Sequence, residues 1–371
     1  MMTNINISPK GIQTLIAKHV KIIPPLTTLV LFVIAYIVGG ILWSDIGFLT
    51  LRNFFSLFSD VNSTYLFISA IGMTMVIISG GIDLSVGSVA ALSTVIIATG
   101  NAVGHGPAGD VGWGLPIMTT ITIALTVGTL LGFFMGILIQ VFKVAPFIAT
   151  LGGMFFARGL CFIISQDSIP IANAWFNSIG RWRWSFPDVM NFNNPNAMVG
   201  INAGVFIFIA LLIVAIIIMR YTKLGRNIYA IGGNEQSAKL MGLSVGRTRV
   251  FVYTFNGFCS ALAGIVFALS IESGWGRHLL GMELDVIAAV VIGGTLLTGG
   301  VGHQLGSVFG ILTTGVIRKF VTFGGLMSGY MRITTAALLF LFVLMQRAVI
   351  MIAEKNKETA AHDDESVKKV S

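Results

Sequence analysis

The stretch from Thr64 to Gly100 reads TYLFISAIGMTMVIISGGIDLSVGSVAALSTVIIATG and contains one charged residue, Asp83. Two apolar runs, residues 64–81 and 84–100, lie on either side of this carboxyl group. A membrane-spanning helix needs about 20 predominantly apolar residues. A glycine-rich interruption is tolerated in a membrane only where the backbone lines protein or a cavity. The stretch therefore predicts a span followed by a half-helix inside a membrane protein.

The composition of the whole chain agrees with this prediction. Of 371 residues, 55% are hydrophobic and only 10% are charged, whereas soluble domains carry about 25% charged residues. So few charges cannot cover a soluble surface, which excludes an ordinary cytosolic enzyme, a disordered chain and a nucleic-acid-binding domain. The 44 glycines favour helices whose backbones pack closely together.

The hydropathy pattern predicts an all-α, polytopic integral membrane protein with about ten transmembrane helices, some of them broken. The apolar segments are 22–43, 64–81, 84–100, 115–141, 146–165, 201–219, 248–271, 286–298, 303–323 and 331–352. The segments at 84–100 and 286–298 are short and interrupted by glycine, which favours half-helices.

The distribution of Lys and Arg orients the chain. With the N-terminus in the cytoplasm, the inside segments and their immediate flanks hold 15 of the 23 Lys and Arg residues, so both termini are predicted to be cytoplasmic. Arg318 and Lys319 fall on the outside and are expected to snorkel to the outer interface. The predicted parts are a cytoplasmic N-terminal segment, a membrane domain with one long outside loop and one long cytoplasmic loop, and a disordered cytoplasmic tail. Their bounds are 1–21, 22–352, 166–200, 220–247 and 353–371.

The glycine-rich break around Asp83 is the first candidate site. An ionised carboxyl group is costly in hydrocarbon, so intramembrane acids face partners or cavities. One interpretation is that Asp83 and Ser85 cap a helix that starts at Leu84; the other is direct contact with a ligand, and both can hold at once. Residues 291–300 repeat the Gly-Gly break of residues 77–88, and paired breaks of this kind indicate a central pathway. The candidate pathway and broken-helix residues are Ser79, Gly80, Gly81, Asp83, Ser85, Arg158, Gly293, Gly294 and Thr295.

Arg158 is the other charged residue inside a predicted span. We expect it to pair with an acid such as Asp83 or to cap carbonyl groups at a broken helix, in preference to binding a ligand. The chain contains no Gly-Lys dipeptide, which excludes a Walker A loop. Cys161 and Cys259 lie in apolar runs and are expected to be packing residues. We predict no catalytic, cofactor-binding or metal-binding residue on this chain.

The two long loops leave alternatives open. Trp175, Trp182 and Trp184 in the outside loop are either interfacial aromatics or part of a short helix or lid on the outer face. In the cytoplasmic loop, Asn234 is a plausible N-cap and Gly242 a plausible C′ residue of a helix of about two turns. This short helix either inserts into a groove of a cytoplasmic partner or rests on lipid headgroups.

Four segments in order, residues 72–88, 150–159, 229–242 and 291–302, resemble the permease subunits of bacterial ABC sugar importers of the ribose, xylose and galactose type. The resemblance extends over residues 55–350. Residues 168–171 (SIPI) and 229–234 (YAIGGN) are most similar to galactofuranose permease subunits.

The resemblance implies a bacterial inner-membrane subunit that translocates a monosaccharide, such as galactofuranose or a similar pentose or hexose. It implies a second permease subunit, identical or homologous, a periplasmic sugar-binding protein, and a cytoplasmic two-cassette ATPase that binds ATP and magnesium. Residues 234–242 match the coupling helix that docks on the ATPase. The candidate coupling residues are Gly232, Gly233, Asn234, Ser237, Ala238, Leu240, Met241 and Gly242.

Three alternatives remain at this point. A branched-chain amino-acid-type ABC permease would carry a zwitterion and would favour a charged pair in the pathway. An ion-coupled secondary carrier would usually show a chain of intramembrane acids, which the sequence lacks. A membrane scaffold without transport activity is disfavoured by the glycine-broken spans.

Overall fold

The computed structural model describes residues 23–44, 47–60, 63–102, 105–106, 109–110, 112–190, 197–325 and scattered positions between 327 and 344. Its helices are α2 (Ile23–Leu42), α3 (Leu51–Ser59), α4 (Thr64–Ile78), α5 (Val86–Asn101), α6 (Ile117–Gln140), α7 (Pro146–Ile164), α8 (Ala174–Arg181), α9 (Ala203–Tyr221), α10 (Lys223–Gly233), α11 (Glu235–Leu240), α12 (Val245–Ile271), α13 (Met282–Ile292) and α14 (Gln304–Phe323). The predicted N-terminal segment, the tail and most of the segment 331–352 lie outside the described residues.

The chain is mostly helical, as predicted, and a few short strands also occur. Three antiparallel pairs form between β1 (His105–Gly106) and β2 (Gly109–Asp110), β3 (Ile169–Pro170) and β6 (Ser273–Gly274), and β4 (Arg183–Pro187) and β5 (Met198–Asn202). Four of the strands are two residues long. Such strands are too short to leave a period-two pattern in the sequence.

Within the described residues, five helices are long and apolar enough to cross a membrane, namely α6, α7, α9, α12 and α14. A sixth span results if α3 and α4, which meet at a bend of 55°, are counted as one. Helix α13 has 11 residues, about 16 Å at 1.5 Å per residue, and is too short to cross alone. The number of spans in the whole chain, ten, stays a prediction.

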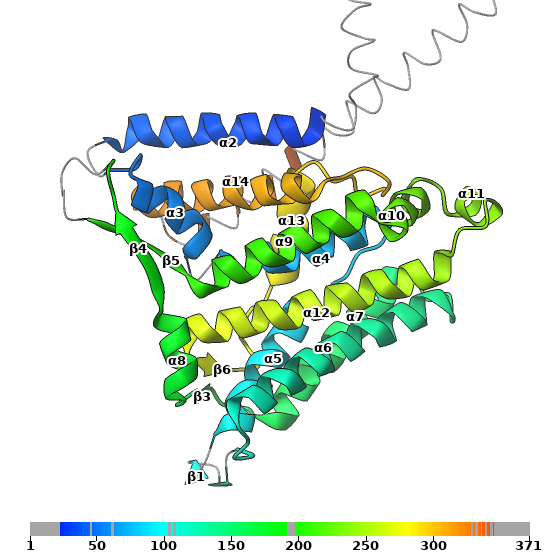
Figure 1. Cartoon of the computed structure of the whole chain (residues 1–371), viewed down its shortest axis with the longest axis horizontal. Coiled ribbons are helices and arrows are strands. Elements are labelled where there is room, and N and C mark those ends of the chain that lie inside the picture. Colours follow the sequence, from blue (N-terminus) through cyan, green and yellow to red (C-terminus); the bar gives the residue numbers. More distant parts are fainter. Residues whose placement is uncertain are drawn as a thin grey trace, which may run out of the picture.

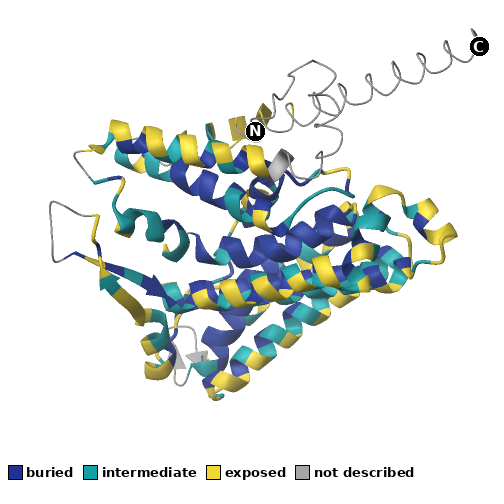
Figure 2. Cartoon of the chain, turned by 45° about the horizontal axis from the view of Figure 1, so that its top comes forward, coloured by how far each residue is buried: buried dark blue, intermediate teal, exposed yellow. Residues whose placement is uncertain are grey.

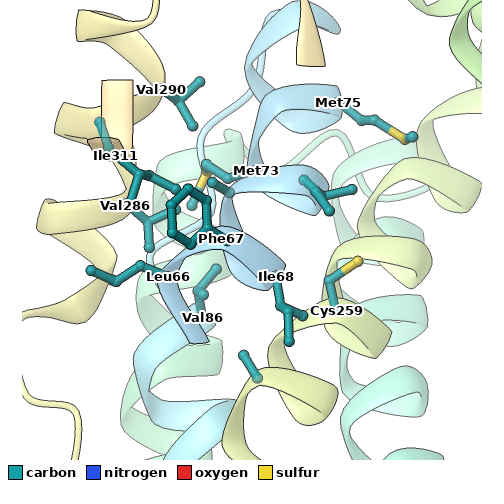
Figure 3. Packing of buried hydrophobic residues seen from close by; sticks show 14 of the residues in the cluster. Leu66, Phe67, Ile68, Met73, Met75, Val86, Cys259, Val286, Val290 and Ile311 are labelled. Atoms are coloured by element: carbon teal, nitrogen blue, oxygen red, sulfur yellow. The ribbon is translucent and has the colours of Figure 1, made fainter. Parts of the chain in front are cut away.

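The helices form an inner and an outer group. Nearly every residue of α4 and α5 is buried, whereas the most apolar windows of α6, α7 and α9 are only 22–33% buried. Figure 2 shows this contrast as dark blue central ribbons and yellow outer ones. The side chains in Figure 3, which include Phe67 and Met73 of α4, Cys259 of α12 and Val286 of α13, fill the space between the inner helices. The outer helices therefore present their apolar faces to lipid.

Glycine allows helices α6 and α12 to pack backbone against backbone. A Cβ atom on Gly132 of α6 would lie 3.0 Å from the Cα of Gly257 on α12, and one on Gly257 would lie 2.9 Å from the Cα of Gly132. The two backbones therefore touch directly, as small residues permit in membrane helices. The glycine content of the sequence predicted this kind of packing but not the partners.

The two ends of the bundle carry different structures (Figure 1). Helices α10 and α11, from the predicted cytoplasmic loop, lie at one end, whereas α8, β3, β4 and β6 lie at the opposite end. At this second end Lys319 does not snorkel outward as expected. Its Nζ atom instead donates to Asn53 Oδ1 at 2.5 Å and to Ser56 Oγ at 2.7 Å, because α3 folds back against α14.

Candidate functional site

The first break separates α4, which ends at Ile78, from α5, which begins at Val86. The helix therefore begins two residues later than the predicted start at Leu84. Asp83 is 1% exposed, and its Oδ1 atom accepts hydrogen bonds from the backbone N–H of Ser85 (2.8 Å) and from Ser85 Oγ (2.6 Å). Ser85 occupies the N-cap position, but its hydroxyl bonds Asp83 and caps no helix N–H. The carboxyl group thus shapes the turn that leads into α5.

Helix α12 supplies the other partner of Asp83, and sequence reasoning missed it. Asn256 Nδ2 donates to Asp83 Oδ2 at 2.8 Å, and both side chains are buried. Tyr253, one turn earlier, is also buried, and a Cβ atom on Gly81 would overlap its hydroxyl oxygen. The spacing of Tyr253 and Asn256, three residues apart in an apolar segment, was the available signal, since such residues share a helix face.

Several buried polar atoms of this region have no hydrogen-bond partner among the described residues. They include Tyr253 Oη, Asn256 Oδ1, Ser88 Oγ and Thr295 Oγ1. Buried hydroxyl and amide groups are normally paired, so these atoms are exceptions within the described part of the chain.

The second break follows α13. Gly293 closes the helix, Gly294 has a φ of +89°, and Thr295 is fully buried. The hydroxyl of Thr28 on α2 donates to the carbonyl oxygen of Ile292 at 2.7 Å. That bond satisfies a carbonyl group that the end of α13 would otherwise leave exposed to hydrocarbon.

The two breaks touch each other. The N–H of Gly300 donates to the carbonyl oxygen of Ile78, the last residue of α4, at 2.8 Å. Gly232, which the sequence assigned to the coupling loop, lies at the same place, because a Cβ atom there would overlap the Ile78 carbonyl oxygen. The structure therefore joins residues that were predicted for two separate roles. Ser79 and Gly80 lie beside this contact, directly after Ile78.

Arg158 does not meet Asp83, so that predicted pairing is wrong. Its Nη1 atom donates to the carbonyl oxygens of Gly276 and His278 at 2.6 and 2.9 Å. The alternative, capping of carbonyl groups, is what the structure shows, although the carbonyls belong to the loop before α13. Asp83 is already satisfied by Ser85 and Asn256, and the guanidinium group of Arg158 ties α7 to a loop more than 110 residues away.

The short helix that was predicted between Asn234 and Gly242 is present as α11, and its coupling role stays a prediction. Asn234 accepts a hydrogen bond from the N–H of Ser237 at 2.8 Å, which confirms it as the N-cap. Gly242 has a φ of +74°, its N–H donates to the Lys239 carbonyl, and the N–H of Leu243 donates to that of Ala238. This pair of bonds is a Schellman motif, which explains why glycine ends the helix here.

The faces of α11 differ from the prediction in one respect. Ala238 is fully buried against Ile231 and Val245 and cannot contact a partner directly. Leu240 and Met241 are 84% and 67% exposed, and they form the apolar tip that projects from the bundle. Figure 1 shows α11 as the outermost element of this end.

Glu235 fixes α11 to the rest of the chain, a contact that the sequence did not indicate. Its carboxylate pairs with Arg249 Nη2 on α12 at 2.6 Å and with Lys239 Nζ at 2.5 Å. Hydrogen bonds from these two cations lower the pKa of Glu235 to about 2. The short helix is thus anchored through a charge-assisted link as well as through Ala238.

At the opposite end, α8 and the β4–β5 pair belong to the loop that was predicted to lie outside, and its location stays a prediction. Trp182 and Trp184 are about half exposed, and their rings contact Phe206 of α9 at 5.9 and 6.2 Å between centroids. Arg181 binds both carboxylate oxygens of Glu272 at 2.7 Å, which holds α8 to the end of α12 and lowers the pKa of Glu272. Among the described residues, no group of three or more His, Cys, Asp or Glu side chains could hold a metal ion.

Comparison with known proteins identifies the family to which the chain belongs. The sequence model of the family described as "Branched-chain amino acid transport system / permease component" matches residues 55–349. The inner membrane ABC transporter permease protein YjfF of Escherichia coli (strain K12) is 36% identical over 338 residues, which cover 91% of this chain and 96% of the relative.

Two further relatives are named for sugars. The fructose import permease protein FruG of Bifidobacterium longum is 36% identical over 343 residues, covering 91% of this chain and 94% of the relative. The ribose import permease protein RbsC of Escherichia coli (strain K12) is 32% identical over 299 residues, covering 81% and 87%. No solved structure matches the chain.

Proposed function

The chain belongs to the family of permease components typified by the branched-chain amino acid transport system, and from this membership we propose that it is the membrane-spanning subunit of an ATP-driven importer for a monosaccharide. It works in the bacterial inner membrane. The observation that carries the substrate class is the 36% identity to a fructose import permease across 91% of the chain.

The polar groups of the break region support an uncharged solute. Asp83 is held by Ser85 and Asn256, and Arg158 is held by two backbone carbonyls, so neither charge is offered to a substrate. The unpartnered hydroxyl and amide atoms at Tyr253, Asn256 and Thr295 suit a polyhydroxylated sugar, which needs hydrogen bonds and no counter-ion.

Energy comes from partner subunits in this proposal. A cytoplasmic two-cassette ATPase binds ATP and magnesium and receives Leu240 and Met241 of α11 in a surface groove. A second permease subunit, identical or homologous, completes the pathway, and a periplasmic sugar-binding protein delivers the solute. This chain supplies the two pathway shapes, between which ATP-driven movement of the partner shifts the population.

The alternatives are less well supported. A zwitterionic amino acid favours a carboxyl–guanidinium pair in the pathway, and Asp83 and Arg158 are committed to separate partners. An ion-coupled carrier favours a relay of intramembrane acids. Galactofuranose is the first sugar to test, because residues 168–171 and 229–234 resemble galactofuranose permeases.

The test is transport by a reconstituted complex. The chain is co-purified with its partner ATPase and placed in proteoliposomes together with the sugar-binding protein. Uptake of radiolabelled galactofuranose, ribose, fructose and leucine is then measured with and without internal ATP. We expect ATP-dependent uptake of one sugar and none of leucine. Concentrative uptake by the chain alone, driven by an ion gradient, would overturn the proposal.

A further inference from the structure

Three chain segments that are far apart in the sequence meet backbone to backbone. They are the end of α4 at Ile78–Gly80, the end of α10 at Gly232–Gly233, and the turn 299–302 between α13 and α14. We call this contact the glycine junction. A Cβ atom on Gly299 would lie 2.9 Å from the Cα of Gly80, and one on Gly300 would lie 2.8 Å from the Cα of Gly233.

No side chain larger than hydrogen fits at the centre of the junction. A Cβ atom on Gly232 would overlap the carbonyl oxygen of Ile78 and the amide nitrogen of Gly300, which are themselves hydrogen-bonded to each other at 2.8 Å. Gly80, Gly299 and Gly300 have φ values of +81°, +87° and +75°, a region that L residues with a side chain rarely adopt. The contact is therefore specified by glycine on all three segments.

A second bond reinforces the junction. The hydroxyl of Tyr229, one turn before Gly232 on α10, donates to the carbonyl oxygen of Gly302 at 2.9 Å. Helix α10 is thus bonded to the second break and packed against the first. Displacement of α10 must therefore displace the ends of α4 and of the 299–302 turn, because packed interfaces do not deform continuously.

The junction is also continuous with the coupling helix. Gly233 directly precedes Asn234, the N-cap of α11, and Ala238 of α11 packs on Ile231 of α10. Only Asn234 separates α10 from α11, so no flexible loop lies between the glycine junction and the exposed tip of α11. Leu240 and Met241 are therefore connected to Gly232 through two short helices that pack on each other.

We propose that the glycine junction, centred on Gly232, is the place where movement of α11 is transferred to both helix breaks at once. This inference rests on the proposed function, since it concerns how hydrolysis on the partner ATPase moves the pathway. Gly232 is a positioning residue here: it touches neither ATP nor sugar, and it sets the distance between α10 and the two breaks.

The test compares sugar transported per ATP hydrolysed in the reconstituted complex. Gly232→Ala should lower this ratio by about tenfold, within the usual range of coupling between distant sites, while ATP hydrolysis continues. Gly233→Ala adds the same methyl group one residue later, where nothing lies within 4 Å, and should lose far less. Gly152→Ala on α7 also meets open space and serves as the control that keeps the wild-type ratio.

A second variant and a second readout cover the case in which Gly232→Ala does not fold. Tyr229→Phe removes the bond to Gly302 without adding an atom, and it should lower the same ratio part of the way. In the wild-type complex, trapping the ATPase with vanadate should change amide hydrogen exchange in residues 229–243, 77–83 and 296–302 together.

The outcomes separate the two proposals. If the wild-type complex transports no sugar, the proposed function fails. If wild type transports normally and Gly232→Ala and Tyr229→Phe keep its sugar-to-ATP ratio, the junction has no transmitting role. Exchange that changes in residues 229–243 while both breaks stay unaffected refutes the junction in the same way.

Discussion

The carboxyl group of Asp83 offers the sharpest test of how the first break is held together. It accepts bonds from the Ser85 N–H, the Ser85 hydroxyl and Asn256 Nδ2, all of them buried. Alanine at this position leaves the Ser85 N–H and the Asn256 amide without their acceptor. Each buried donor left unsatisfied costs about 1–3 kcal/mol, so we expect Asp83→Ala to lower the free energy of unfolding by about 2–6 kcal/mol.

Asparagine at the same position should behave differently. Asp83→Asn keeps an oxygen for Ser85 and places an NH₂ group against Asn256. In the unmodified chain the Oδ1 atom of Asn256 has no hydrogen-bond partner. In the variant, rotation of the Asn256 amide lets this oxygen accept a bond from the new NH₂ group at position 83. One unsatisfied atom replaces another, and we expect a loss below about 1 kcal/mol.

The assay is denaturant titration of the purified subunit in mixed micelles, followed by circular dichroism. Ser93→Ala is the control, because it removes a buried hydroxyl of α5 whose bond runs only to its own helix at Val89. Equal losses for Asp83→Ala and Asp83→Asn would refute the reasoning, as would a wild-type stability for Asp83→Ala. The first result would mean that charge, and not the acceptor, holds the break.

Three further predictions concern α11. Gly242→Pro cannot adopt the φ of +74° and removes the N–H that bonds Lys239, so it should abolish ATP-dependent uptake while the circular dichroism spectrum stays unchanged. The pKa of Glu235 is lowered to about 2 from its usual 4.5. The stabilisation from its ion pair with α12 is therefore complete above about pH 4.5 and is lost as the pH falls toward 2. Amide hydrogen exchange in residues 234–242 should rise over that interval, and Glu235→Gln should remove this pH dependence. Replacing the exposed Leu240 and Met241 by serine should leave stability unchanged and weaken co-purification of the ATPase; full recovery of the ATPase with this double variant would exclude them as the docking tip.

Sequence reasoning succeeded where the determining chemistry is local. Asn234 caps α11 by bonding Ser237, three residues later, and Gly242 ends it by bonding Lys239, three residues earlier. Each end thus depends on residues close in the sequence, so residue types at fixed spacing predicted both. The glycine pair in the predicted segment 286–298 marks the end of a short helix in the same way, although α13 begins at Met282 and ends at Ile292, directly before Gly293. Ala238 shows the limit of that approach. Its small side chain suggested a docking face, but the fold turns it toward Ile231 and Val245.

The remaining features depend on residues that only the folded chain brings together. Asn256 lies 173 positions after Asp83 and 184 positions after Gly72, against which it packs. Pattern within one segment cannot specify such a partner, because many helix pairings satisfy the same periodicity. The glycine junction is the same kind of feature: Gly80, Gly232 and Gly300 each looked like an independent break or turn.

The backbone groups at the ends of the interrupted helices need hydrogen-bond partners inside the membrane. A helix end inside a membrane leaves carbonyl and N–H groups without partners, at a cost of several kcal/mol each in hydrocarbon. The Ile78 carbonyl at the end of α4 is satisfied by the Gly300 N–H, the Ile292 carbonyl by the Thr28 hydroxyl, and the Ser85 N–H by Asp83. The second break thus supplies one bond to the first break, and helix α2 supplies one bond to the second. Because α10 contacts both breaks, through Gly232 at the first and through Tyr229 at the second, the transfer of movement that we propose would act on the two breaks together.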